Sequence, residues 1–217
     1  MAKRERLNTP NKLRFQKREG LIPFMEYFGP TIQGEGMVIG QKTFFVRTAF
    51  CQYSCGWCDS KFTWDGTQQP EWITPTELKT RILETLTDEN GKRNCGHITL
   101  TGGNPGLIGK EMEEFIDLMK AEGFQFSMET QGVNWQDWYT KVDQIVMSPK
   151  PPSSGMKTNF RILDKIIDKL NEADANWSLK VVIFDDIDFE YAREVFKRYR
   201  APNLSLIHIS EPTRRTP

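Results

Sequence analysis

The alternation of strand-like and helix-like segments constrains the fold of this chain more than any other feature. The predicted strands are 42–48, 97–103, 124–130, 144–149 and 179–184, and the predicted helices are 74–86, 110–123, near 135–142, 159–173 and 188–199. Strands that recur about every 25 to 35 residues with helices between them indicate βαβ units and a parallel sheet. About five or six such units are too few for a closed eight-stranded barrel. An incomplete open barrel and a doubly wound sheet both fit the pattern.

The segment 74–86 carries the clearest helix signals. Thr74 is a candidate N-cap, Pro75 occupies the first helical position, and Glu77 completes a capping box. The sequence therefore predicts that the helix begins directly after Thr74.

Composition excludes several classes of protein. The 217 residues include 29 Lys and Arg against 29 Asp and Glu, so the formal net charge is zero. We therefore expect neither nucleic acid nor a membrane as partner. A chain with a full core does not need disulfides, and the spacing of its cysteines suits metal binding better. A reducing compartment, the cytoplasm, is the expected location.

The two ends of the chain differ from the middle. Residues 1–22 begin with a basic stretch without clear periodicity, which predicts a poorly ordered extension. Residues 23–203 form the expected single domain. Residues 204–217 begin LSLIHISEPTR, which matches the translation of a sequencing-library adapter, so we expect a foreign tail in place of the native C-terminus. This tail, with His208, is left out of the fold prediction.

Unusual polar clusters follow four of the predicted strands. They are the cysteine loop after 42–48, "TGGNP" after "HITL", "ETQG" at the end of 124–130, and "SPKPPSS" after "QIVM". Ligands of parallel α/β sheets bind at the carboxyl ends of the strands. The four clusters are therefore expected to converge on one functional site.

Three cysteines lie within eight positions, at Cys51, Cys55 and Cys58. Cys55-Gly-Trp-Cys58 resembles a thioredoxin-type redox pair, but a third cysteine precedes it. A structural zinc needs four ligands, for which Cys95 or His97 is the candidate fourth. A 4Fe–4S cluster held by three thiolates is the third possibility, and it leaves one iron open to a small-molecule ligand. On that hypothesis Cys95 is a small buried apolar residue.

The spacing Cys-x3-Cys-x2-Cys, with Trp57 before the last cysteine, resembles the radical S-adenosylmethionine superfamily. The glycine turn of that superfamily is often Gly-Gly-Glu-Pro, whereas this chain has Gly102-Gly103-Asn104-Pro105. Together with "FGPTIQGEG", "ETQG" and "SPKPPSS", the cysteine loop is similar to the 7-carboxy-7-deazaguanine synthase family, from about Pro23 to Asn203. This resemblance implies an α/β fold of one domain, an incomplete (βα)6-type TIM barrel.

The resemblance also implies a role for each matching residue. Cys51, Cys55 and Cys58 would hold the 4Fe–4S cluster, and Ser60 would be a ligand of Mg²⁺. The residues expected beside S-adenosylmethionine are Trp57, Cys58, Asp59, Gly103, Asn104, Glu129, Ser148, Pro149 and Lys150. Those expected around the substrate are Ile32, Gln33, Gly34, Glu35, Arg47 and Thr101. Arg47 would pair with the substrate carboxylate, although a structural ion pair is an alternative. Phe50 departs from the family, which usually has glycine there.

The family's activity implies conversion of 6-carboxy-5,6,7,8-tetrahydropterin to 7-carboxy-7-deazaguanine with release of ammonia, on the route to queuosine. The expected partners are the pterin substrate, a second copy of the chain in a homodimer, and a flavodoxin-type electron donor. Two alternatives remain open: a glycyl-radical-enzyme activase of the same superfamily, and a zinc-stabilised binding module.

Overall fold

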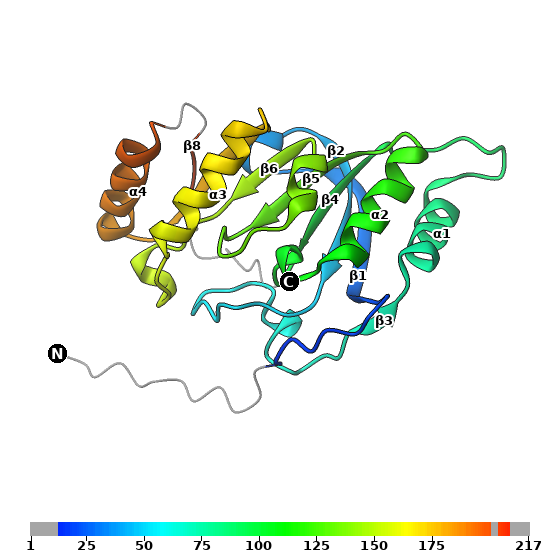
Figure 1. Ribbon diagram of the computed structural model, residues 1–217, viewed down its shortest axis with the longest axis horizontal. Helices are drawn as coiled ribbons and strands as arrows, with labels where there is room; N and C mark the ends of the chain where they lie inside the picture. Colours follow the sequence, from blue (N-terminus) through cyan, green and yellow to red (C-terminus); the bar gives the residue numbers. More distant parts are fainter. Residues whose placement is uncertain (1–12, 201–203, 209–217) are drawn as a thin grey trace, which may run out of the picture.

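The computed structural model describes residues 13–200 and 204–208, and in these residues the strands form one eight-stranded sheet (Figure 1). The order across the sheet is β3-β1-β2-β4-β5-β6-β7-β8. The strands are β1 (Ile22–Ile32), β2 (Lys42–Thr48), β3 (Glu71–Ile73), β4 (His97–Gly102), β5 (Gln125–Thr130), β6 (Gln144–Met147), β7 (Trp177–Ile183) and β8 (Leu204–His208).

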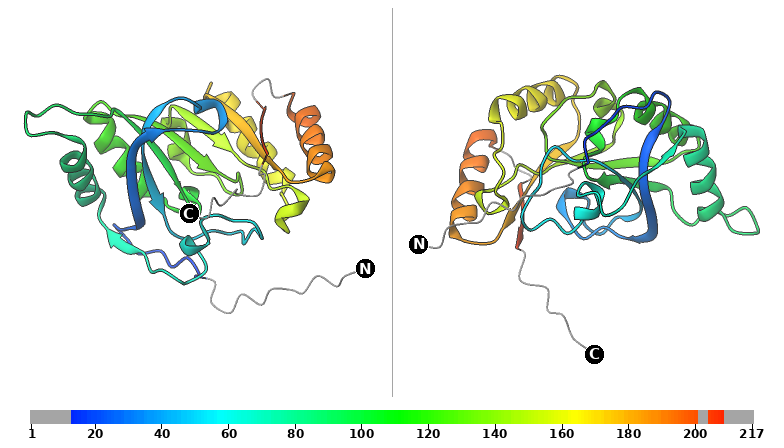
Figure 2. Two further views of the ribbon diagram at one scale, coloured as in Figure 1. Left: turned by 180° about the vertical axis from the view of Figure 1, so that it is seen from behind. Right: turned by 90° about the horizontal axis from the view of Figure 1, so that it is seen from below.

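From β2 to β8 the strands are parallel and follow one another across the sheet in chain order. A sheet wound in one direction places its right-handed crossover helices on a single face. Figure 2 shows this arrangement, with the helices in an arc outside the curved sheet. The doubly wound alternative is therefore wrong, and the incomplete barrel describes the fold.

The helices begin and end close to the predicted positions. They are α1 (Pro75–Leu86), α2 (Lys110–Ala121), α3 (Phe160–Glu172) and α4 (Asp186–Tyr199), with short 3-10 helices η1 (Gly36–Val38), η2 (Lys61–Thr63), η3 (Pro105–Leu107), η4 (Asp137–Lys141) and η5 (Pro152–Ser154). The hydroxyl of Thr74 accepts a hydrogen bond from the Glu77 backbone N–H, which confirms the predicted N-cap.

The two faces of the sheet differ in chemistry because side chains alternate along each strand. The outer face and the helices bury the hydrophobic core, for example Ile98 and Leu100 of β4 against Leu78 of α1 and Phe115 of α2. The inner face is polar: the hydroxyls of Thr43, Thr99 and Ser127 form a ladder with O–O distances of 2.8 Å across β2, β4 and β5. A buried polar face of this kind is the natural place for a polar ligand.

Three of the eight strands were not predicted: β1, β3 and β8. β1 runs antiparallel to both of its neighbours, β2 and β3, and β3 is the edge strand on that side of the sheet. Gly29-Pro30 interrupts the β1 segment, and such pairs usually indicate a turn in sequence analysis. The predicted parallel sheet therefore carries an antiparallel extension.

The segment that the fold prediction left out contributes the edge strand β8, which pairs in parallel with β7. Its foreign origin stays a prediction, and residues 209–217 lie outside the described part. At the other end, the expectation of poor order falls partly on residues 1–12, which are also outside it. Leu13 donates a backbone hydrogen bond to the Trp64 carbonyl oxygen, so the chain contacts the domain before β1 begins. None of the helices described is long and apolar enough to cross a membrane.

Candidate iron–sulfur and substrate site

The cysteine loop follows β2 and runs along the lower edge of the sheet in Figure 1, where the parallel strands end. The glycine turn after β4 lies directly against it. The N–H of Gly103 donates to the Thr48 carbonyl oxygen at 2.9 Å, and the N–H of Asn104 donates to the Phe50 carbonyl oxygen at 2.7 Å. This backbone contact leaves no room for a side chain at Gly103, where a Cβ would lie 2.5 Å from the Phe50 carbonyl carbon.

Phe50, the residue that departs from the family pattern, adopts φ +70°. The left-handed region favours glycine because a Cβ there crowds the backbone. The Phe50 ring is nonetheless buried, and it packs against Phe15 at 5.4 Å and Trp72 at 5.9 Å between ring centroids. The phenylalanine thus combines a strained backbone with a packed side chain.

Glycine usually stabilises a folded protein less than alanine does. At position 50 we expect the reverse order of stability for the two variants, Phe50→Gly and Phe50→Ala. Both changes remove the ring, but only glycine relieves the strain, which is worth about 1 kcal/mol. We expect Phe50→Gly to be the more stable of the two by that amount in urea unfolding. A Phe50→Ala protein as stable as Phe50→Gly would contradict the strain at this position.

The three cysteines of the loop are thiols that carry different contacts. Gln131, from the turn after β5, donates through Nε2 to the Cys51 Sγ at 3.4 Å, and the Trp64 indole N–H donates to the Cys58 Sγ at 3.4 Å. Burial raises the pKa of the Cys55 thiol to about 11, with Cys51 and Cys58 adding to it and Lys150 opposing it. The loop therefore gathers three sulfurs and a cation in a largely buried place.

This donor set fits a 4Fe–4S cluster and does not fit a single zinc ion. Among the residues that the structure describes, no three Cys, His, Asp or Glu side chains converge closely enough to hold one metal ion. A cubane cluster instead takes one thiolate on each of three irons, so its ligands do not meet at a point. His97 and Cys95 lie at or just before the start of β4, whereas the cysteine loop packs against the turn after its end. The zinc alternative is therefore wrong.

The thioredoxin-type alternative also lacks its structural setting. Cys58 is followed by the three-residue helix η2 and not by the α-helix that such a pair precedes. Cys95 lies in the hydrophobic core, 6% exposed, as expected for a small apolar residue.

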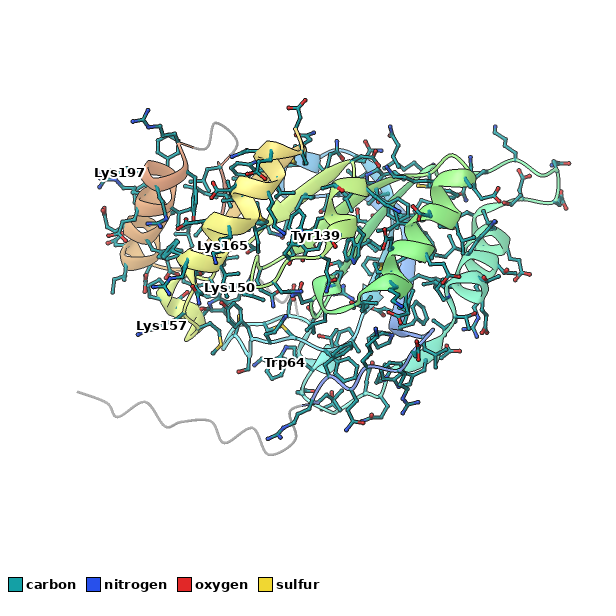
Figure 3. The ribbon with its side chains drawn as sticks, viewed as in Figure 1. Trp64, Tyr139, Lys150, Lys157, Lys165 and Lys197 are labelled. Atoms are coloured by element: carbon teal, nitrogen blue, oxygen red, sulfur yellow. The ribbon has the colours of Figure 1, made fainter. Side chains whose placement is uncertain are left out.

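Trp57, within the cysteine loop, lies against the "SPK" turn that follows β6. The Lys150 Nζ lies 5.5 Å from the Trp57 ring centroid and donates to the Ser148 hydroxyl at 3.0 Å. Burial lowers the pKa of Lys150, with the nearby Cys55 acting in the opposite direction. Pro149, between Ser148 and Lys150 in the chain, is buried. Figure 3 labels Lys150 of this turn and Trp64, whose indole contacts Cys58.

Asn104 and Ser60 have protein partners. The Asn104 side chain is fully buried; its Nδ2 donates to Gln52 and its Oδ1 accepts from Thr130, so a cofactor contact would come through its backbone. The Ser60 hydroxyl donates to the neighbouring Asp59 carboxylate at 2.8 Å. Ser60 and Asp59 therefore offer adjacent hard oxygen atoms.

Glu129 lies at the centre of a buried network on the inner face. It accepts hydrogen bonds from Thr101 at 2.8 Å and from Lys180 at 3.0 Å, and the Gln33 amide lies 3.5 Å away. Lys180 also donates to Glu35 at 2.7 Å. Glu129 thus lies among the predicted substrate residues, although the family resemblance implies a place beside S-adenosylmethionine for it.

The charges of this network stabilise one another. Burial alone would raise the pKa of Glu129, but Lys180 and Thr101 hold it below its usual range. Burial alone would lower the pKa of Lys180, but Glu129 and Glu35 raise it. Both groups are therefore charged near neutral pH.

The remaining predicted substrate residues, Arg47, Ile32 and Gly34, do not take part in the Glu129 network. Arg47 lies opposite Thr101 in the β2–β4 register, and its Nε donates to Glu26 at 2.8 Å, so the structural ion pair that we considered does form. Ile32 is 61% exposed, and a Cβ on Gly34 would meet nothing within 4 Å. Ile32 and Gly34 therefore stand apart from the buried network.

Three hydrogen-bonding residues of this site are not among the predicted ones: Lys180, Gln131 and Trp64. Lys180 carried a usable signal, because it is a lone cation within the apolar strand Trp177–Ile183. Gln131 belongs to "ETQG", from which only Glu129 was selected. Trp64 carried no signal, since its indole reaches Cys58 only through the fold of the loop.

Comparison with known proteins defines the class first. Residues 32–150, more than half of the chain, match the family described as "4Fe-4S single cluster domain", to which the chain belongs. A crystal structure of QueE from Escherichia coli shares the fold, with a TM-score of 0.65 and 23% identity over 89% of this chain and 85% of that one. A structure of anSMEcpe with bound AdoMet has a TM-score of 0.57 and 15% identity, covering 76% and 48%. The predicted α/β single-domain fold with an open sheet is confirmed.

A sequence relative narrows the class. The 7-carboxy-7-deazaguanine synthase of Bacillus subtilis (strain 168) is 53% identical over 182 residues, which cover 82% of this chain and 72% of the relative. The chain belongs to the 7-carboxy-7-deazaguanine synthase family of radical S-adenosylmethionine enzymes.

Proposed function

We propose that this chain converts 6-carboxy-5,6,7,8-tetrahydropterin to 7-carboxy-7-deazaguanine with release of ammonia. The observation that carries the proposal is the position of the three-cysteine loop beside the buried Glu129 network. Gln131 contacts Cys51 and lies two residues beyond Glu129, so cluster ligands and substrate residues share one site. The Bacillus subtilis relative supports the choice of reaction.

Cys51, Cys55 and Cys58 would hold a 4Fe–4S cluster. With S-adenosylmethionine bound, this group supplies the radical that starts the rearrangement of the substrate. The Lys150 cation and the Trp57 ring suit the carboxylate and the sulfonium of S-adenosylmethionine. Ser148 accepts a hydrogen bond from Lys150 and so holds the amine in place.

The inner face suits a flat polar heterocycle with a carboxylate. Glu129 can accept hydrogen bonds from the amino and ring N–H groups of a pterin, while Lys180 keeps Glu129 ionised. Thr101 and Gln33 add neutral donors around it. The guanidinium of Arg47 is the cation for the substrate carboxylate.

Ser60 would take a water-rich Mg²⁺ together with the substrate carboxylate, and the adjacent Asp59 carboxylate supports a hard cation there. A homodimer, a flavodoxin-type electron donor and a cytoplasmic location complete the proposal. Each follows from the family resemblance.

Anaerobic reconstitution with iron and sulfide tests the function. We expect about four irons per chain, cleavage of S-adenosylmethionine when the protein is reduced with dithionite, and conversion of the carboxypterin. The matched control is Cys95→Ala, which changes a core cysteine away from the loop and should keep the iron.

The possible outcomes test the cluster assignment and the substrate assignment separately. Protein that binds no iron would overturn the cluster assignment. Protein that cleaves S-adenosylmethionine but leaves the carboxypterin unchanged would overturn the substrate and favour the glycyl-radical activase.

A further inference from the structure

Two side-chain N–H groups donate to two of the three cysteine sulfurs that are proposed to hold the cluster. The donors are Gln131 Nε2 to Cys51 Sγ and Trp64 Nε1 to Cys58 Sγ, each at 3.4 Å. Neither donor has a role in the proposed binding of S-adenosylmethionine, Mg²⁺ or the pterin. Both need a separate explanation.

The fold holds each donor in place. Trp64 is only 4% exposed, its backbone N–H donates to the Lys61 carbonyl at 2.9 Å, and its own carbonyl accepts from Leu13. Gln131 is 5% exposed, and its Nε2 also donates to the Gln52 side chain at 2.9 Å. Buried N–H groups with fixed surroundings keep their orientation when a nearby charge changes.

Such donors favour a more negative sulfur. Reduction of a 4Fe–4S cluster adds one electron, supplied by an external one-electron donor, and the added charge is shared by iron and sulfur. Hydrogen bonds to the sulfurs stabilise the reduced form, so their number is one of the factors that set the potential. The effect is strong where water is excluded.

We propose that Gln131 and Trp64 are positioning residues that raise the reduction potential of the cluster by hydrogen-bonding Cys51 and Cys58. The inference rests on the proposed cluster at the three cysteines. Gln131 comes from the turn after β5, the strand that carries Glu129, and Trp64 comes from the cysteine loop, so two segments act on the same cluster.

Trp64→Phe tests the inference, because phenylalanine keeps most of the packing and removes the N–H. In a redox titration followed by electron paramagnetic resonance, we expect a tenfold lower ratio of reduced to oxidised cluster at a given solution potential. For one electron this corresponds to a midpoint about 59 mV lower. Gln131→Leu should shift the potential in the same direction, and it keeps the inference testable if Trp64→Phe does not fold.

The control is Trp138→Phe, which removes a buried indole N–H that donates to the Ile108 carbonyl oxygen and contacts no cysteine sulfur. It should lower stability and leave the potential unchanged. An unchanged potential in both test variants, or an equal shift in Trp138→Phe, would overturn the inference. Wild-type protein that assembles no cluster would instead overturn the proposed function, so the two failures are distinguishable.

Discussion

Replacing Lys180 by methionine is expected to lower the free energy of unfolding by about 3 to 5 kcal/mol, because it leaves a buried carboxylate without its counter-ion. The Lys180 side chain is 10% exposed and that of Glu129 is 21% exposed, so water replaces little of the lost interaction. Glu35, the other partner, is 47% exposed and can be hydrated. Urea unfolding near neutral pH measures the loss.

The pH dependence of the variant should have the opposite sign to that of the wild type. In the wild type the pKa of Glu129 is lowered, so its contribution to stability is present above the unfolded value, about 4.3, and is lost as pH falls. The raised pKa of Lys180 adds stability below about 10.4, which is lost as pH rises through the folded value. Without Lys180, burial, the largest influence on the pKa of Glu129, is opposed by the Thr101 hydrogen bond and the Lys150 charge. We therefore expect that pKa to rise, and Lys180→Met should become more stable as pH falls from about 8 to about 5.

The double variant Lys180→Met with Glu129→Gln is the matched control. It removes both charges and keeps the shapes of the side chains, so we expect it to recover at least half of the lost stability. A double variant as unstable as Lys180→Met would mean that packing, and not the unpaired charge, causes the loss.

Gly103→Ala should cost about 3 kcal/mol, because its Cβ meets backbone atoms of Phe50, which would have to shift to make room. The same clash separates the glycine turn from the cysteine loop. We therefore expect the variant to retain less iron after reconstitution, in addition to its lower midpoint in urea.

Gly96→Ala is the matched substitution for this test. A Cβ at Gly96 meets nothing within 4 Å, and its backbone does not require glycine. Alanine there should be neutral or stabilise by about 0.5 kcal/mol, because it restricts the unfolded chain. Equal losses in Gly96→Ala and Gly103→Ala would contradict the close backbone contact.

Local patterns carried most of the correct fold predictions. The helix start at Thr74 and the order of the βα units depend on residues within a few positions of one another. The three-cysteine spacing likewise lies within eight residues and indicated the cluster. The antiparallel strand β1 escaped prediction because its partners, β2 and β3, are identified only by their pairing in space.

The amino-acid pattern alone was enough to predict the parallel βα order, a site at the carboxyl ends of the strands, and the family. The three-dimensional fold was needed to show which polar groups meet inside that site. Lys180 reaches Glu129 across 51 positions and Glu35 across 145, and Gln131 reaches Cys51 across 80. Contacts at such separations depend on strand register and winding, which no local pattern of residues specifies.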